Sequence, residues 1–389
     1  MISWLFAASS SAMELDSSKF RFSGYGTFAA GKVIDSEPDA LFFADTPSGA
    51  FYDDRLEVKP ETMLGTQLDV DLGEGLRLGV QMTAKGGTGF DTELEWLYLN
   101  YDIVPALSLQ VGRVRIPYYH FSESIEVGYT YHWLRPPTEI YISAVTVMEG
   151  GKFIYTTHWG DVDIQTQVFG GSTDPVPAVI FSRKFDATIE AGLHKIYGAN
   201  LEFTYESLSF RLGMTHAAAN GFFQDNSNIL GGGAGVVYPV NPETAKDDTY
   251  LSSLFYDDGK FLLGAEGWVK DSDTGGRNNP AISWYVTSGY RFGNWLPSLT
   301  YSNWKDKSEK AIGTGEIDQS TITFALRWDF QPNAALKLQI DNISTNGEPS
   351  SSLPSGLAPV PDLQFTNPAN KAGNVDDLTV IAIGIDFIF

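Results

Sequence analysis

The residues best suited to chemistry in this sequence lie between Ile116 and Ala144, in a stretch that reads IPYYHFSESIEVGYTYHWLRPPTEIYISA. It combines three glutamates and one arginine with seven tyrosine, phenylalanine and tryptophan rings. Exposed connections are seldom so aromatic, because the rings would remain in water. Folded inward against a surrounding wall, the rings would be buried and the carboxylates would border a narrowed aqueous passage. The predicted constriction residues are Glu123, Glu126, Arg135, Glu139, Tyr118 and Tyr131. An external flap and a contact between subunits are the alternatives.

Such a passage needs a polar wall, and charged residues on alternating segments are placed to supply one. A charge is costly in lipid, so these side chains must face water. Bases on the wall that face acids in the 116–144 stretch would create a transverse field, and rings of charge set ion preference. We expect Arg21, Arg77 and Arg327 to face the three glutamates. The predicted wall residues are Arg21, Arg77, Lys85, Arg113, Arg115, Arg327, Lys337, Asp69 and Glu95. Further charged residues of the same parity are Lys152, Arg211, Arg291, Asp71, Glu93, Asp163, Glu202, Glu266, Asp329 and Asp341.

Two of these arginines do not fit the alternation. Arg113 and Arg115 share their parity with the apolar Leu109 and Val111, which would direct them to lipid. A bulge at Gly112 would switch the parity, and a position above the membrane is the alternative. We expect the bulge, with both guanidinium groups at the mouth of the passage.

Catalytic, cofactor and metal chemistry find little support in the residue pattern. The histidines are His120, His132, His158, His194 and His216. None lies in a nucleophile motif such as GxSxG, and neither HxxxH spacing nor any cysteine is available to bind a metal. The glycine-rich run 231–235 lacks the Lys-Ser/Thr pair of a phosphate-binding loop. We therefore expect no enzyme, no cofactor and no metal site.

The last stretch, Asp376 to Phe389, shows which elements build the wall. Side chains two apart point to the same side of a strand. One stripe is therefore Thr379, Ile381, Ile383, Ile385, Phe387 and Phe389, and the other is Val380, Ala382, Gly384, Asp386 and Ile388. In a soluble protein this flat apolar strand would be an aggregation template. A closed barrel in lipid instead pairs it with the first strand and leaves no edge. A buried strand of a soluble sandwich is the alternative.

The same alternation recurs along the chain in pairs of segments. The predicted strands are Lys19–Val33, Thr62–Leu72, Leu76–Lys85, Glu93–Asp102, Leu107–Arg115, Lys152–Trp159, Val162–Phe169, His194–Tyr205, Leu208–His216, Thr249–Tyr256, Phe261–Lys270, Ser283–Phe292, Trp295–Trp304, Thr321–Phe330, Ala335–Ile343 and Asp376–Phe389. Most approach the ~9–11 residues that a tilted strand needs to cross a bilayer.

The connections between these strands are sorted by length. Seven very short turns alternate with eight connections that include several long ones. Short turns at one rim and long loops at the other are typical of an outer-membrane barrel. Aromatic residues near the predicted rims, among them Trp159, Trp295 and Trp304, suit the interfacial belts of such a barrel.

Composition narrows the possible partners. The chain has 389 residues, 43% hydrophobic, which excludes disorder, and no run approaches the 18 or more apolar residues of a spanning helix. Without cysteine there is neither a disulfide framework nor a thiol nucleophile. A net charge of −22 argues against nucleic acid and against a basic module that binds a lipid surface. Most of the surplus acid falls in loops and rims, so it does not predict the selectivity of a pore.

The first twelve residues differ from the rest. Ile2 to Ala7 is apolar, and Ser10 and Ala12 suit the −3 and −1 positions of a signal-peptidase site, although no basic residue precedes Lys19. We expect residues 1–12 to be the remnant of a secretion signal, with a disordered leader as the alternative. Residues 13–389 are predicted to form one domain.

Three motifs carry a resemblance to a known family. The opening FSGYGTF, the middle VGRVRIP and the closing IDFIF resemble the Gram-negative outer-membrane porins of the sixteen-stranded class. The likeness covers residues 19–389, and the final phenylalanine resembles the assembly signal of bacterial outer-membrane barrels. The motifs are typical of the superfamily and do not indicate a solute.

The resemblance implies an all-β fold, a sixteen-stranded antiparallel transmembrane β-barrel whose third extracellular loop folds inward. It also implies passive diffusion of small hydrophilic solutes and ions, a homotrimer, and contact with outer-membrane lipids and lipopolysaccharide. The termini are expected in the periplasm. A substrate-specific channel with a weak solute site at the aromatic loop, and a barrel that acts as scaffold or receptor in an envelope complex, are the alternatives.

Overall fold

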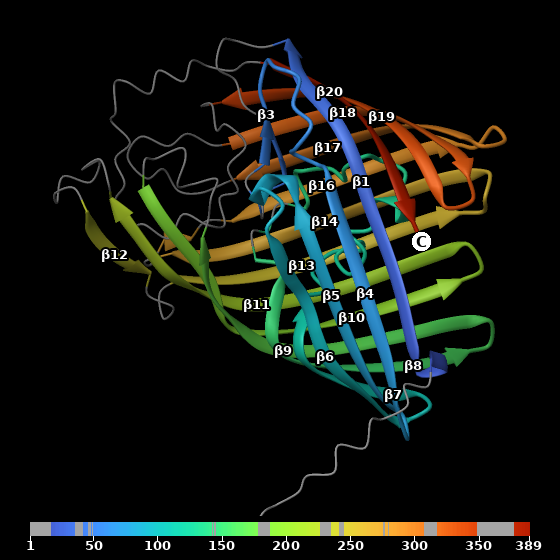
Figure 1. Ribbon diagram of the computed structural model, residues 1–389. Helices are drawn as coiled ribbons and strands as arrows, with labels where there is room; N and C mark the ends of the chain where they lie inside the picture. Colours follow the sequence, from blue (N-terminus) through green and yellow to red (C-terminus); the bar gives the residue numbers. More distant parts are fainter. Residues whose placement is uncertain are drawn as a thin grey trace, which may run out of the picture.

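The structure is a computed structural model (Figure 1), and it describes residues 17–35, 42–45, 48, 50–141, 143, 145–177, 187–225, 235–240, 245–274, 277–278, 280–306, 317–347 and 377–389. The expected signal remnant, the Gly231–Ala234 part of the glycine-rich run and the proline-rich 353–368 stretch lie outside these residues. None of the helices among the described residues is long and apolar enough to cross a membrane.

Sixteen long strands dominate the described chain. They are β1 (Phe20–Asp35), β4 (Met63–Gly73), β5 (Leu76–Lys85), β6 (Thr92–Val104), β7 (Leu107–Arg115), β8 (Val147–Trp159), β9 (Val162–Pro177), β10 (Ala187–Tyr205), β11 (Leu208–Asp225), β13 (Ala245–Asp257), β14 (Phe261–Thr274), β16 (Ala281–Tyr290), β17 (Trp295–Asp306), β18 (Ile317–Gln331), β19 (Ala334–Gly347) and β20 (Asp377–Ile388). Shorter elements are β2 (Phe42–Asp45), β3 (Ala50–Tyr52), β12 (Val236–Val240), β15 (Arg277–Asn278) and the 3-10 turns η1 (Ser17–Lys19), η2 (Gly86–Thr88) and η3 (Gly128–Thr130).

The long strands form a closed antiparallel ring. Each pairs with its sequence neighbours, and β1 pairs with both β4 and β20, so the first and last strands close the sheet. The short β12 and β15 only extend the pairing beyond β11 and β14. Closure satisfies the backbone hydrogen bonds of every edge, which a sheet in lipid requires. The predicted sixteen-stranded barrel is confirmed, and each predicted strand overlaps one observed strand.

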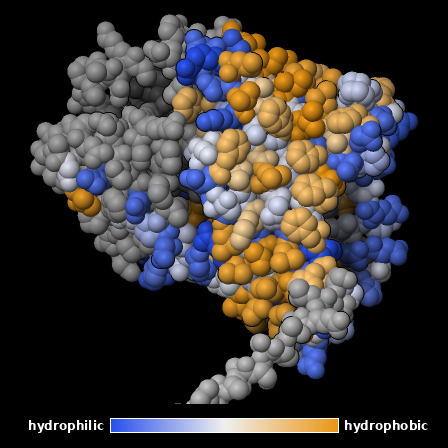
Figure 2. Space-filling model, viewed as in Figure 1, coloured by the Kyte–Doolittle hydropathy of each residue, from blue (hydrophilic) through white to orange (hydrophobic). Residues whose placement is uncertain are grey.

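Two stripes of opposite chemistry explain why these segments form a barrel. On β19 every second residue from Ala335 to Ile343 is buried, including Lys337 and Asp341, whereas Ile322 and Phe324 on β18 are exposed on the other face. Figure 2 shows that apolar residues dominate the outer face of the strands in view. An apolar outside and a polar inside are the pattern of a barrel that crosses a bilayer.

Tight turns join the strands at one rim. Gly160 and Gly293 have φ values of 59° and 58°, a left-handed conformation that favours glycine in so short a turn. The start of β1 and the end of β20 lie at this rim too, because the Phe389 carbonyl accepts a hydrogen bond of 2.8 Å from the Gly24 amide. The Ile388 amide donates one of 2.9 Å to the Asn333 carbonyl in the last short turn.

At the opposite rim the strands are longer than predicted. β9 continues to Pro177 and β11 to Asp225, where pairing with β10 persists after the apolar alternation ends. The hairpin of β2 and β3 lies in the first long connection, which the sequence did not predict to be structured. Trp304, expected at a rim, is instead 2% exposed within an apolar cluster that includes Tyr131 and Trp133.

Candidate functional site

The third connection, residues 116–146, bonds to the buried stripes of strands around the ring. Its hydrogen-bonding and ion-pair partners include Lys85 on β5, Lys152 on β8, Gln167 on β9, Asn200 on β10, Arg211 on β11, Glu266 on β14, Thr287 on β16, Thr300 and Ser302 on β17, Thr321 and Arg327 on β18, and Lys337, Gln339 and Asp341 on β19. All of these partners are buried. The connection is therefore fixed along most of its length.

Aromatic rings anchor the middle of the connection. Trp133 is fully buried, its indole nitrogen donates a 2.8 Å hydrogen bond to Thr300 Oγ1, and its ring lies edge-on to Tyr285. Phe121 lies edge-on to Tyr131 and Trp133 in the same cluster. Ring pairs in this geometry contribute about 0.5–1.5 kcal/mol beyond the area that they bury. The aromatic content that singled out this stretch thus serves to hold it.

Glu126 joins two cations at one side of the connection. One of its oxygens lies 2.9 Å from Lys85 Nζ and 3.1 Å from Arg115 Nη2. Glu95 bonds to the same two cations, at 3.2 Å from Lys85 and 2.8 Å from Arg115. Burial opposes the ionisation of Glu126, but Lys85 and Arg115 outweigh it and hold its pKa at about 2. Glu126 is therefore ionised at neutral pH, where it pairs with both cations.

Glu123 and Glu139 have different surroundings. Glu123 pairs with Lys152 and accepts a 3.1 Å hydrogen bond from Gln167. Partial burial opposes its ionisation, yet Lys152 lowers the pKa of Glu123 below its usual value. Glu139 is 1% exposed and accepts hydrogen bonds from Ser302 Oγ at 2.8 Å, Gln319 Nε2 at 2.8 Å and Thr321 Oγ1. Glu139 therefore anchors the third connection through hydrogen bonds, and the side chains that donate to it are neutral.

Arg135 connects the third connection to the first. It lies 2.9 Å from Glu61 and also pairs with Asp341 on β19. Its guanidinium carbon lies 4.7 Å from the centre of the Phe42 ring and 5.8 Å from that of Tyr52. Tyr52 is fully buried and donates a 2.5 Å hydrogen bond to Glu61. The sequence analysis did not include Phe42, Tyr52 and Glu61, although four aromatic residues in a polar connection were an available signal.

The cations expected to face the glutamates have other partners. Arg21 pairs with Asp69 at 3.0 Å, and its side chain is 78% exposed. Arg77 pairs with Asp102 at 2.8 Å next to a short turn. Only Arg327 reaches the third connection, where it donates to the Tyr129 and Tyr131 carbonyls at 2.8 and 2.9 Å and not to a glutamate. The expected facing pairs are wrong, because strand alternation predicts the face of a side chain and not its height along the barrel.

The predicted bulge at Gly112 is also wrong. β7 pairs with β6 and with β8 without a register shift at Gly112. A register shift occurs instead where β6 pairs with β5, and the residue that it leaves unpaired is Glu95. Arg113 lies in an exposed pair with Glu149, whereas Arg115 is 3% exposed. The two arginines therefore do not act together. Tyr118, predicted at the constriction, is half-buried against the apolar cluster of Val114, Ile116 and Met148.

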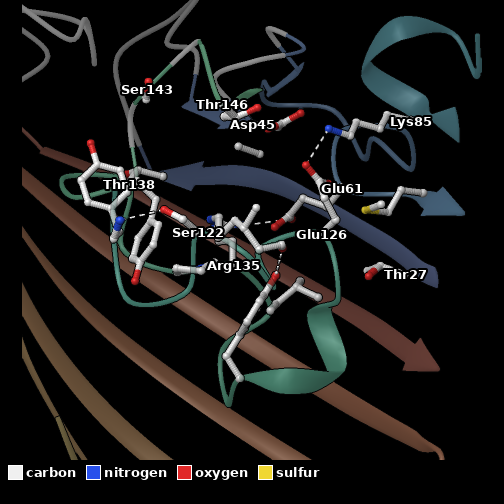
Figure 3. A pocket seen from close by; sticks show the side chains of 18 of the residues that line it. Thr27, Asp45, Glu61, Lys85, Ser122, Glu126, Arg135, Thr138, Ser143 and Thr146 are labelled. Atoms are coloured by element: carbon white, nitrogen blue, oxygen red, sulfur yellow. Dashed lines mark hydrogen bonds and ion pairs between the residues drawn. The ribbon is translucent and has the colours of Figure 1, made fainter. Parts of the chain in front are cut away.

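A cavity of about 140 Å³ lies between the first and third connections (Figure 3). Glu61, Lys85, Glu126 and Arg135 border it, together with Asp45 from the β2–β3 hairpin. Among the described residues, no group of three or more histidine, cysteine, aspartate and glutamate side chains could hold a metal ion. The cavity is thus bordered by charges of both signs, which come from the first connection, the end of β5 and the third connection.

Solved structures share this architecture. An OmpT of Vibrio cholerae aligns with a TM-score of 0.60 at 11% identity, covering 95% of this chain and 97% of that one. The outer membrane channel DcaP of Acinetobacter baumannii gives 0.57 at 11% identity, with 95% and 97% covered. An anion-selective porin from Comamonas acidovorans gives 0.53 at 15% identity, with 95% and 99% covered.

The chain has the fold of the sixteen-stranded outer-membrane porins. No protein-family model and no curated protein matches its sequence. At these identities the likeness establishes the porin fold alone, so the function must be argued from the residues of this chain.

Proposed function

We propose that the protein is an outer-membrane porin, a passive diffusion channel for small hydrophilic solutes and ions. The observation that carries this proposal is the closed ring with an apolar outer stripe and a buried stripe of charged and hydroxyl residues. Side chains such as Lys337, Asp341 and Thr300 are costly in lipid, so the stripe that bears them faces a polar interior. A polar interior inside a lipid-facing barrel is suited to hydrated solutes.

The third connection is proposed to form the constriction inside the barrel. Support comes from its bonds to Lys85 on β5, Glu266 on β14 and Lys337 on β19, which are far apart in the order of the ring. One segment can reach such strands together from within the ring. Glu123 and Glu126 are the acids of this constriction, and Lys85, Arg115 and Lys152 are its bases.

The proposal excludes an enzymatic role. His120 stacks on Phe255 at 4.1 Å between ring centres, and His132 bonds to Thr287 Oγ1 at 3.0 Å. Burial and Arg211 lower the pKa of His120 to about 4, so it is neutral at physiological pH. These contacts are those of packed side chains, and neither imidazole ring is bonded to a serine or an acidic side chain. Incubation with peptide and phospholipid substrates should give no products.

The protein is further proposed to lie in the outer membrane as a homotrimer, in contact with lipids and lipopolysaccharide, with periplasmic termini. Support comes from the short-turn rim, where β1 begins and β20 ends, since porin barrels place short turns in the periplasm. A V. cholerae OmpT structure is described as a trimer form. Chemical crosslinking in whole cells should yield a band of three chains, and a tag at either terminus should be protected from external protease.

Planar-bilayer recording tests the channel directly. The full chain should insert in discrete steps and conduct potassium chloride without a bound activator. A silent but folded barrel would overturn the channel and favour the scaffold or receptor alternative. A conductance that a particular solute blocks would instead favour a substrate-specific channel, the second candidate, which the charged cavity beside the third connection supports.

A further inference from the structure

The cavity between the first and third connections carries balanced charge on its lining. Three carboxylates, Asp45, Glu61 and Glu126, meet three cations, Lys85, Arg115 and Arg135. These groups come from the β2–β3 hairpin, the turn before β4, the ends of β5 and β7, and the third connection. A lining with equal numbers of both signs does not favour a solute with a net charge of either sign.

Two groups on this lining keep bonding capacity that the protein does not use. Arg115 is 3% exposed, and only its Nη2 is bonded, so its Nε and Nη1 have no partner. Glu61 has an 8% exposed side chain whose Oε2 binds Arg135 and Tyr52, while its Oε1 has no partner. A buried polar group without a partner costs about 1–3 kcal/mol, and more when charged. Beside the cavity, Arg115 therefore lacks an acceptor for these two nitrogens, and Glu61 lacks a donor for its Oε1.

The size of the cavity limits which solutes could bond to both Arg115 and Glu61. A volume of about 140 Å³ is close to that of an engineered cavity of roughly 150 Å³ that holds benzene, a molecule of six heavy atoms. Ile116, Ile125 and Leu134 supply apolar wall between the charged groups. Space for about six heavy atoms and an apolar wall between two opposite charges describe a small molecule with a short hydrocarbon part.

We propose that this cavity is a binding site for small zwitterions of the amino-acid type, with the solute carboxylate at Arg115 and its ammonium group at Glu61. The inference rests on the proposed channel function and gives its solute class. Burial raises the pKa of Glu61 against the effect of Arg135, and an ammonium group beside Oε1 would favour its ionised form. An anion would lie against Glu126 and Asp45 as well as Arg115, and a cation against Lys85 and Arg135, so either alone meets repulsion.

Alanine and its isomer lactamide provide a matched pair, because they have the same atoms but only alanine is a zwitterion. Proteoliposomes containing the full chain should take up labelled L-alanine in a saturable way. Unlabelled alanine should compete at least tenfold more strongly than lactamide, lactate or tetramethylammonium. Uptake that rises linearly with alanine concentration, or equal competition by lactamide, would overturn the inference.

Variants locate the site. Glu61→Gln and the double change Arg115→Gln with Glu95→Gln, which removes a cation and its partner together, should each weaken alanine competition at least tenfold. Arg55→Gln is the control, because Arg55 has a 74% exposed side chain paired with Asp53 outside the cavity. Heat-modifiable migration in gels identifies the variants that fold, and a single folded variant is sufficient for the test. If unlabelled alanine competes as strongly in a folded variant as in the unsubstituted chain, the binding site does not lie in this cavity.

The same preparations separate the two proposals. If the unsubstituted chain is silent in potassium chloride, the channel function fails and this inference fails with it. If the chain conducts but alanine uptake does not saturate, only the zwitterion site fails.

Discussion

The ammonium nitrogen of Lys337 lies 2.7 Å from a carboxylate oxygen of Asp386, and neither side chain is exposed. The other oxygen of Asp386 accepts a 2.5 Å hydrogen bond from Thr27, so β1, β19 and β20 are linked at the seam that closes the ring. Lys337 also donates to the carbonyls of Gly128 and Trp133 at 2.6 Å each. One buried pair therefore joins barrel closure to the position of the third connection.

Removing the cation of this pair should destabilise the barrel strongly. Lys337→Met leaves Asp386 buried without its charge partner, and breaking a buried pair in this way costs about 3–5 kcal/mol. Urea unfolding followed by tryptophan fluorescence should show the loss. The double variant Lys337→Met with Asp386→Asn should recover part of it, since no lone charge remains. Equal stability of the single variant and the parent would contradict a structural role for the pair.

Acid should release the third connection from the barrel wall only at a pH well below the usual pKa of a carboxyl group. The pKa of Glu126 is lowered from its ordinary 4.5 to about 2. A lowered pKa in the folded state gives stabilisation that is complete above the ordinary value and lost as the pH falls through about 2. Single-channel conductance should therefore stay steady from neutral pH to about pH 4 and become noisy towards pH 2. Glu126→Gln should remove this step, Glu149→Gln should keep it, and a step between pH 4 and 5 would exclude Glu126 as its source.

Alternation predicts faces well and partners poorly. Ile383, Ile385 and Asp386 take the sides that the sequence indicates, because lipid and water select opposite residue types on a strand. Arg21 and Arg77 take different partners from those expected, because their height in the barrel depends on strand tilt and stagger. A signal was present: both arginines lie beside the short-turn rim, whereas Lys85 ends its strand next to a long connection. The β2–β3 hairpin carries no alternation long enough to detect.

Glu139 should tolerate an amide but not a hydrocarbon. Glutamine keeps an oxygen for Gln319 and Thr321, and its amide group can donate to the Ser302 hydroxyl, which accepts as well as donates. Glu139→Leu leaves these buried donors unmatched, at about 1–3 kcal/mol each. Denaturant midpoints should thus fall little for the glutamine variant and substantially for the leucine variant. Two similar midpoints would show that the carboxylate does not anchor the connection.

Charge at the constriction should set ion preference through Glu123 and Glu126. Replacing both with glutamine removes two negative charges and leaves Lys85, Arg115 and Lys152 less neutralised. The reversal potential in a salt gradient should shift towards anions, while conductance changes modestly because side-chain size is kept. The shift should shrink near 1 M salt, where the screening length falls to about 3 Å.

A matched control removes the same number of negative charges at positions outside the constriction. Glu57→Gln with Glu149→Gln also deletes two acids paired with arginines, Arg55 and Arg113, at positions that are 34% and 50% exposed. This variant should keep the parent's reversal potential. Deleting residues 118–143 should instead raise conductance severalfold, because it removes the obstruction itself. If the Glu123 and Glu126 variant keeps its reversal potential and the deletion keeps its conductance, the third connection does not constrict the pore, and selectivity must arise elsewhere on the barrel wall.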